Sequence, residues 1–94
     1  MLPSREIAEV VGLQAMAWLA ANDELLPVFM GATGASTSDF RENLQDPVFQ
    51  ASVLDFLLMD DTWIVQFCDA QELAYDMPMR ARAALPGAEQ VHWT

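Results

Sequence analysis

The sequence has no lysine and only four arginines, against fourteen aspartate and glutamate residues, and its formal net charge is −10. A chain with so few cations repels nucleic-acid phosphates and anionic membranes, because binding to either requires clustered lysine and arginine. We therefore expect neither nucleic acid nor membrane as a partner. A basic protein surface would be attracted instead, although excess acid also serves simply to keep an apolar-rich chain in solution.

Cysteine and histidine are each present once, as Cys68 and His92. One cysteine cannot form an intrachain disulfide, and one Cys with one His cannot form an ordinary zinc site. Cys68 is predicted to face inward beside Asp69, where burial and a negative neighbour raise a thiol pKa and leave the thiol inert. His92 lies in a segment without helical periodicity, so nothing is predicted to hold it beside a nucleophile. We expect no enzyme, no catalytic residue, no metal and no cofactor.

Long uninterrupted hydrophobic runs are also missing. Residues 1–12 lack a basic start followed by a continuous apolar segment, because Glu6 and Glu9 interrupt them. The apolar region 48–65 is broken by three aspartates. Neither region is typical of a signal peptide or a transmembrane helix. We expect a cytoplasmic protein.

Hydrophobic residues make up 53% of the 94 residues. This supply is enough for one modest core without a metal or a disulfide. We predict a single domain over residues 1–94, and we expect its fold to be all-α because the apolar residues recur with helical spacing.

The most apolar stretch is predicted to form a helix over Pro47–Met59. Asp46 is a good N-cap, and proline is well tolerated at the first helical position. Apolar side chains cover roughly 220° of this helix, so we expect other helices to surround it. Ser52 and Asp55 lie on the remaining narrow face, which we expect to meet water. A buried Asp55 paired with an arginine is the alternative.

Two further helices are predicted around clear end signals. Ser4 is an N-cap for a helix over Arg5–Ala21, whose apolar residues leave almost no polar face, so this helix too should be covered on several sides. Ser36 and Asp39 have the spacing of a capping box and predict a helix to about Gln45.

The remaining three helices are shorter or less regular. Residues 23–34 predict a short helix that Pro27 either kinks or delays, ended by Gly34. Residues 60–62 open a fifth helix. Asp76 caps a sixth helix, which Pro86-Gly87 stops.

Residues 4–45 and 46–87 show weak similarity to each other, with residues 88–94 left as a tail. Val10 aligns with Val48, and Leu19 aligns with Leu57. This predicts two pseudo-equivalent three-helix halves, and chance similarity between helical segments is the alternative.

Two runs also resemble a known family. They are DPVFQASVLDFLLMDD at residues 46–61 and RARAALPG at residues 80–87. Both are similar to small bacterial proteins grouped as domain of unknown function 3572, over about residues 7–87. The resemblance implies an all-helical fold and a bacterial source, and it implies no activity.

A compact bundle of about six helices has limited surface with which to cover two such apolar helices. We therefore predict a non-catalytic protein-interaction or adaptor module that offers an apolar face rimmed by acid to a basic partner or to a second copy of itself. The predicted contact residues are Trp63, Met77, Met79 and Trp93. The alternative is an acidic regulator that mimics nucleic-acid charge against a basic partner. An enzyme is the third hypothesis, and it requires an enclosed pocket with convergent polar groups.

Overall fold

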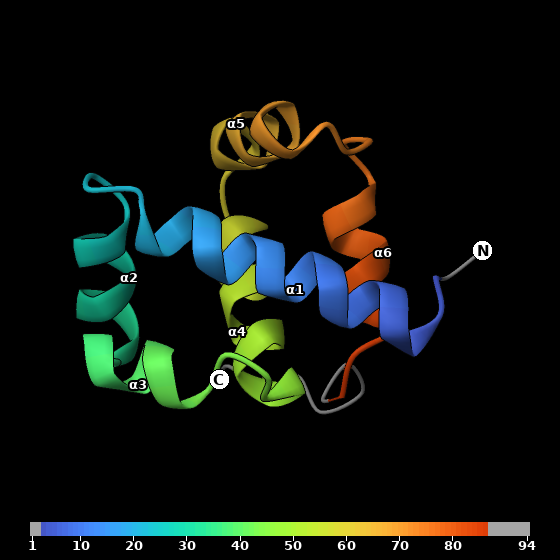
Figure 1. The fold of residues 1–94 in the computed structure, drawn as a ribbon. Helices are drawn as coiled ribbons and strands as arrows, with labels where there is room; N and C mark the ends of the chain where they lie inside the picture. Colours follow the sequence, from blue (N-terminus) through green and yellow to red (C-terminus); the bar gives the residue numbers. More distant parts are fainter. Residues whose placement is uncertain (1–2, 87–94) are drawn as a thin grey trace.

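A computed structural model describes residues 3–86, which form six helices joined by turns and contain no strand (Figure 1). The predicted all-α fold and the number of helices are confirmed. The predicted likeness of the two halves stays a prediction. The helices are α1 (Arg5–Ala20), α2 (Leu26–Thr33), α3 (Thr37–Glu42), α4 (Pro47–Leu57), α5 (Asp61–Gln71) and α6 (Met77–Ala83).

Four of the helices begin at the polar residues that the sequence predicts. Ser4, Asp46 and Asp60 each accept a hydrogen bond from a backbone N–H of the helix that follows. Ser36 and Asp39 form the reciprocal capping box of α3. These bonds satisfy backbone donors that have no partner inside the helix.

Asp76 begins α6, but the prediction that its side chain caps the helix is wrong. A capping side chain needs an extended backbone at its own residue, whereas Asp76 has helical angles of φ −89° and ψ −6°. Its carboxylate instead lies 3.7 Å from the Arg80 guanidinium, one turn further along.

Proline and glycine set the limits of α2. Pro27 lies in the first turn and the helix begins at Leu26, so the proline delays the helix and does not kink it. The turn before the helix is held by Asn22, whose side-chain oxygen accepts from the N–H groups of Glu24 and Leu25. Gly34 ends the helix at φ 79°, a left-handed conformation that suits glycine.

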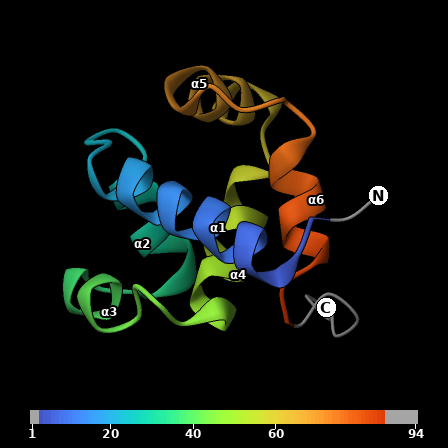
Figure 2. The same ribbon diagram turned by 45° about the vertical axis from the view of Figure 1, so that its right-hand side comes forward.

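α1 lies across α4 at the centre of the molecule (Figures 1 and 2). α5 and α6 contact both of these helices. The predicted burial of the helix at residues 47–59 is confirmed on one side, because α4 buries Gln50, Ala51, Val53, Leu54, Phe56 and Leu57. The core therefore lies mainly between α1 and α4.

A cluster of phenylalanine rings attaches α2 and α3 to this centre. The ring of Phe29 lies 5.4 Å from that of Phe40 and 5.2 Å from that of Phe56, both edge to face. Phe49 packs against the same two rings, Phe29 and Phe40. Edge-to-face pairs of this kind contribute about 0.5–1.5 kcal/mol beyond the area that they bury. The cluster fixes where the end of α2 lies against α4.

The expectation that Asp55 faces water is wrong, and the alternative of a pair with an arginine is the one found. Asp55 is half-buried, and its Oδ1 accepts a hydrogen bond of 2.6 Å from Arg82 Nε on α6. Asp55 thus ties α4 to α6, whereas Val48 in the first turn of α4 and Met59, two residues beyond its end, are exposed.

The expectation that α1 is covered on several sides is also wrong. Ile7, Val10 and Leu13 are 51%, 57% and 40% exposed. The buried residues Ala8, Val11, Gly12, Ala15, Met16 and Leu19 lie on the other side of the same helix. Because one side is buried and the other is open, α1 keeps an uncovered apolar face.

Candidate interaction surfaces

The first uncovered surface, called here the α1 outer face, consists of Ile7, Val10 and Leu13. These residues are three apart in sequence, a spacing that keeps them on one side of a helix. Glu6 and Glu9 lie on the same part of α1 and are both accessible. Glu9 also forms an ion pair of 2.8 Å with Arg5, so the face is apolar along its middle, with the carboxylate of Glu6 and this ion pair beside it.

A hollow lies on each side of the α1 outer face. One, of about 510 Å³, is lined by Ile7, Val10 and residues of the α5–α6 region, including Leu73 and Met77. The other, of about 260 Å³, is lined by Val10 and Leu13 together with Gln45 and Gln50. Val10 lines both hollows, so it lies between them.

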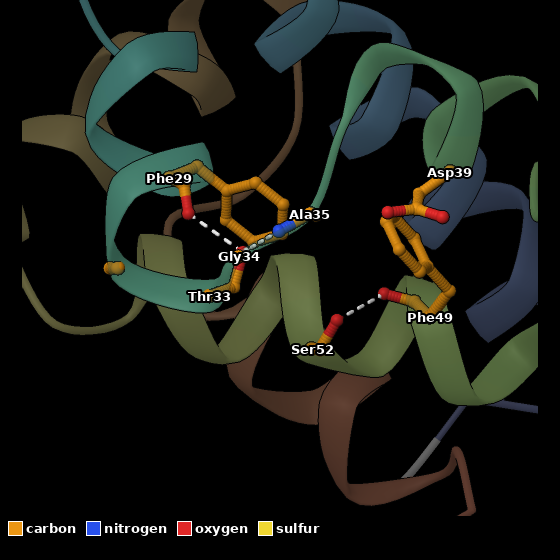
Figure 3. Close-up of a pocket in the computed structure, with 8 residues that line it drawn as sticks. Phe29, Thr33, Gly34, Ala35, Asp39, Phe49 and Ser52 are labelled. Atoms are coloured by element: carbon orange, nitrogen blue, oxygen red, sulfur yellow. Dashed lines mark hydrogen bonds between the residues drawn. The ribbon is translucent and has the colours of Figure 1, made fainter.

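The second surface, called here the α2–α4 groove, runs between the end of α2 and the outward side of α4. It consists of two adjoining hollows of about 490 and 480 Å³, which share Ala32, Thr33 and Ser52. Figure 3 shows the first hollow, with side chains that come from α2, α3 and α4. The remaining lining residues are Phe29, Gly34, Ala35, Asp39 and Phe49 in the first hollow and Asp55, Phe56 and Met59 in the second.

The two hydroxyl groups in the groove donate their protons to backbone carbonyls. Thr33 Oγ1 donates to Phe29 O at 2.7 Å, and Ser52 Oγ donates to Phe49 O at 2.8 Å (Figure 3). An activated nucleophile instead directs its proton to a base. The hydroxyls therefore shape the groove and help to fix the helices that form it.

The groove has negative charge at both ends. Asp39 lines the first hollow and Asp55 lines the second. The carboxyl end of α2 also lies here, at Ala32, Thr33 and Gly34, where the last carbonyl groups of a helix carry partial negative charge. The described residues that line the groove include no lysine or arginine. Arg82 reaches one of these charges, that of Asp55.

Cys68 is fully buried, as predicted. Burial raises the pKa of its thiol, and the carboxylates of Asp69 and Asp76 raise this pKa further. The thiol lies 3.5 Å from the carbonyl oxygen of Ala74, to which it donates a weak hydrogen bond. A protonated and covered thiol of this kind is a poor nucleophile.

The structure describes three of the four predicted contact residues. Trp63 is half-buried and stacks on Phe56 with ring centroids 4.7 Å apart. Met77 is half-buried and lines the larger hollow beside α1. Met79 is 59% exposed on α6. Trp93 lies outside the described residues. Of these residues, Met77 is the one that lines a described hollow.

The sequence reasoning missed most of the residues that form the two surfaces. Ile7, Val10 and Leu13 looked like core residues, because no sequence signal tells which apolar side of a helix finds a neighbour. Ser52 was placed on the water-facing side of the helix predicted over Pro47–Met59, which is where the groove lies, and Met59 at its end lines the same groove. Nothing in the sequence indicated that Thr33 would lie opposite them.

No group of three or more His, Cys, Asp and Glu side chains within residues 3–86 has an arrangement that could hold a metal ion. No helix of the described chain combines the length and the apolar character needed to cross a membrane.

Comparison with known proteins gives one positive finding. Residues 5–88 match the model of a protein family described as a protein of unknown function, DUF3572. No curated protein and no solved structure matches the chain. The match agrees with the resemblance seen in the two sequence runs, and it carries no activity with it.

Proposed function

The chain belongs to the DUF3572 family, and for this member we propose the function of a small, non-catalytic interaction module that binds a basic partner protein. One observation carries the proposal: α1 keeps Ile7, Val10 and Leu13 exposed in a row, with Glu6 and Glu9 beside them. A contiguous apolar face with an acidic rim is typical of a protein-binding surface.

The charge of the chain favours a basic partner over a second copy. In a symmetric dimer the α1 outer faces of the two copies would meet, which would bring the acidic residues beside both faces into one interface. Two chains of formal charge −10 would also repel each other. A partner rich in lysine and arginine is attracted by the same charges, which speeds its encounter and excludes acidic competitors.

The alternative of a nucleic-acid mimic requires acidic residues gathered on one face. Among the described residues, acids occur on or beside all six helices, with Asp23 and Glu24 just before α2, and several are used in helix caps or ion pairs. No observation on the described residues favours the mimic over the interaction module.

The test is affinity capture on the immobilised protein with identification of bound proteins by mass spectrometry, repeated with Val10→Ser and Val28→Ser. Val10 and Val28 are 57% and 48% exposed, and Val28 lines neither the α1 hollows nor the groove. We expect a basic protein that binds the wild type and Val28→Ser, and that binds Val10→Ser about tenfold more weakly, because a buried apolar contact is lost.

Two further measurements complete the test. Binding of the purified partner should weaken as salt is raised, since the rim charges are accessible and screened. Light scattering should give the mass of a monomer, whereas a dimer that Val10→Ser dissociates would show that a second copy covers the face. A monodisperse monomer that retains no protein would refute the proposal.

A further inference from the structure

The α2–α4 groove is separate from the α1 outer face and differs from it in chemistry. Its floor is aromatic, with Phe29, Phe49 and Phe56, and its charged lining residues are Asp39 and Asp55. We propose that this groove is a second docking site, which takes one arginine side chain of a partner protein together with the apolar residue beside it.

The first hollow has the chemistry that recognises a guanidinium group. Asp39 supplies a carboxylate, and Thr33 and Gly34 lie at the carboxyl end of α2, where helix carbonyls are partly negative. The half-buried ring of Phe49 supplies a face on which a planar cation stacks, whereas Phe29 is only 1% exposed and packs behind it (Figure 3). A lysine ammonium would gain the charge but not the planar stacking, which is why arginine is the better fit.

Asp39 can accept a further donor although it already caps α3. Its Oδ2 accepts the backbone N–H of Ser36 at 2.8 Å. An ionised carboxylate has two oxygens and about four acceptor positions. The capping bond also holds the Asp39 side chain in place, so an arriving arginine would not have to immobilise it.

The second hollow suits an apolar side chain. Phe56 is buried and Met59 is 76% exposed, so the flexible methionine stands at the open side of an aromatic wall. Methionine adapts its shape to an arriving apolar group more readily than a branched residue does. Asp55 in this hollow already forms an ion pair with Arg82. The arginine of the partner is therefore expected at the other end of the groove, beside Asp39.

The groove has the length of a short peptide segment. Phe49 and Phe56 lie seven residues apart on α4, which corresponds to about 10 Å along a helix. An extended segment covers this length with about three residues. The occupant is therefore one arginine flanked by apolar residues, and a second copy of this chain is disfavoured by its ten excess negative charges.

The experiment uses the acetylated tripeptide amide Leu-Arg-Leu and the same peptide with citrulline in place of arginine. Citrulline keeps the shape of arginine and removes its charge. Binding to the full chain is followed at low salt by the movement of backbone amide signals in nuclear magnetic resonance. We expect signals of residues 32–35 and 52–56 to move and saturate, with the arginine peptide bound about fivefold more tightly.

Two variants separate the two ends of the groove. Asp39→Asn should abolish most of the preference for arginine over citrulline and leave the affinity for the citrulline peptide nearly unchanged. Met59→Ser should weaken both peptides by a similar factor, about threefold. Asp23→Asn and Met79→Ser are the matched controls, since both residues are exposed and neither lines the groove. The controls should bind like the wild type.

The inference is overturned if neither peptide binds, if the preference for arginine survives Asp39→Asn, or if the signals that move are those of α1. These outcomes leave the proposed function standing, because that function is tested by Val10→Ser on another helix. Loss of partner capture by Val10→Ser with intact peptide binding would be the converse result, and it supports two separate surfaces.

Discussion

A Cβ atom added to Gly12 would lie 2.7 Å from the Cβ of Gln50, closer than two such carbon atoms can approach. Gly12 is on α1 and Gln50 is on α4, so the two central helices pack closely at this point. The Gln50 side chain is held there by a hydrogen bond of 2.9 Å from its Nε2 to the carbonyl oxygen of Leu44. Its Cβ is fixed by the backbone and cannot rotate away.

We expect Gly12→Ala to destabilise the protein. Alanine gains about 1 kcal/mol over glycine in helix propensity, whereas overpacking a close helix crossing costs about 1–3 kcal/mol. The overlap involves a fixed Cβ atom, so the net loss should be roughly 1–2 kcal/mol. Urea unfolding followed by circular dichroism measures it.

Gly31→Ala is the control for this prediction. Gly31 is inside α2, and a Cβ added there meets nothing within 4 Å. Gly31→Ala should therefore show only the gain in helix propensity, which should stabilise the protein by about 0.5–1 kcal/mol. If both variants moved the urea midpoint in the same direction, the close approach of Gly12 to Gln50 would not explain the effect of Gly12→Ala on stability.

The ion pair between Asp55 and Arg82 should contribute measurably to stability, because the two side chains are only 27% and 12% exposed. Asp55→Ala leaves Arg82 with its weaker bond to the carbonyl oxygen of Pro86, at 3.3 Å. We expect a loss of about 2 kcal/mol, and a double-mutant cycle with Arg82→Ala should give a coupling energy of about 1–2 kcal/mol.

The pair between Arg5 and Glu9 is the comparison for this cycle. Those side chains are 53% and 38% exposed, and they are one helical turn apart. A double-mutant cycle on Arg5 and Glu9 should give a coupling energy of about 0.3–0.5 kcal/mol. Equal coupling energies in the two cycles would mean that burial does not strengthen the pair between α4 and α6.

The features that the sequence predicted correctly are local ones. Ser4, Asp46 and Asp60 cap helices whose first turns lie within three residues of them, and Gly34 ends its own helix. Such features depend on the conformation of a few neighbouring residues, so the sequence contains the information that decides them.

The features that were predicted wrongly depend on distant residues. The partner of Asp55 lies on another helix, and the exposure of Val10 depends on which side of α1 the helices α4, α5 and α6 occupy. Helical periodicity shows that a face is apolar, but it does not show whether a neighbour covers that face. The groove was missed for the same reason, because Thr33 and Ser52 line one groove only when α2 and α4 lie side by side.

Glu72 has a left-handed backbone at the end of α5, with φ 58° and ψ 46°. Glycine is the usual residue at such a position because a Cβ atom is strained there. We expect Glu72→Gly to stabilise the protein by about 1 kcal/mol in urea unfolding. Glu72→Gln keeps the strained Cβ and removes the charge, so it should leave stability nearly unchanged. If Glu72→Gln stabilised as much as Glu72→Gly, charge and not backbone strain would be the cause.

Tyr75 is the single tyrosine of the chain, so its ionisation can be followed without interference from another phenol. Its hydroxyl donates a hydrogen bond of 2.7 Å to Asp69, and this bond, with the negative charge of Asp69, raises the pKa of Tyr75 above 10.0. The bond needs the phenol proton, so it is fully present below pH 10.0 and is lost as the pH rises through the higher pKa of the folded state.

Titration of the ultraviolet absorbance of tyrosinate should therefore give a midpoint above 10.0 in the wild type. Asp69→Ala removes both the acceptor and the charge, and it should bring the midpoint back toward the ordinary value. Asp61→Ala removes a charge from the first turn of the same helix, whereas Asp69 lies near its end, and should leave the midpoint nearly in place. An equal shift in both variants would assign the raised pKa to the net charge of the protein and not to the hydrogen bond between Tyr75 and Asp69.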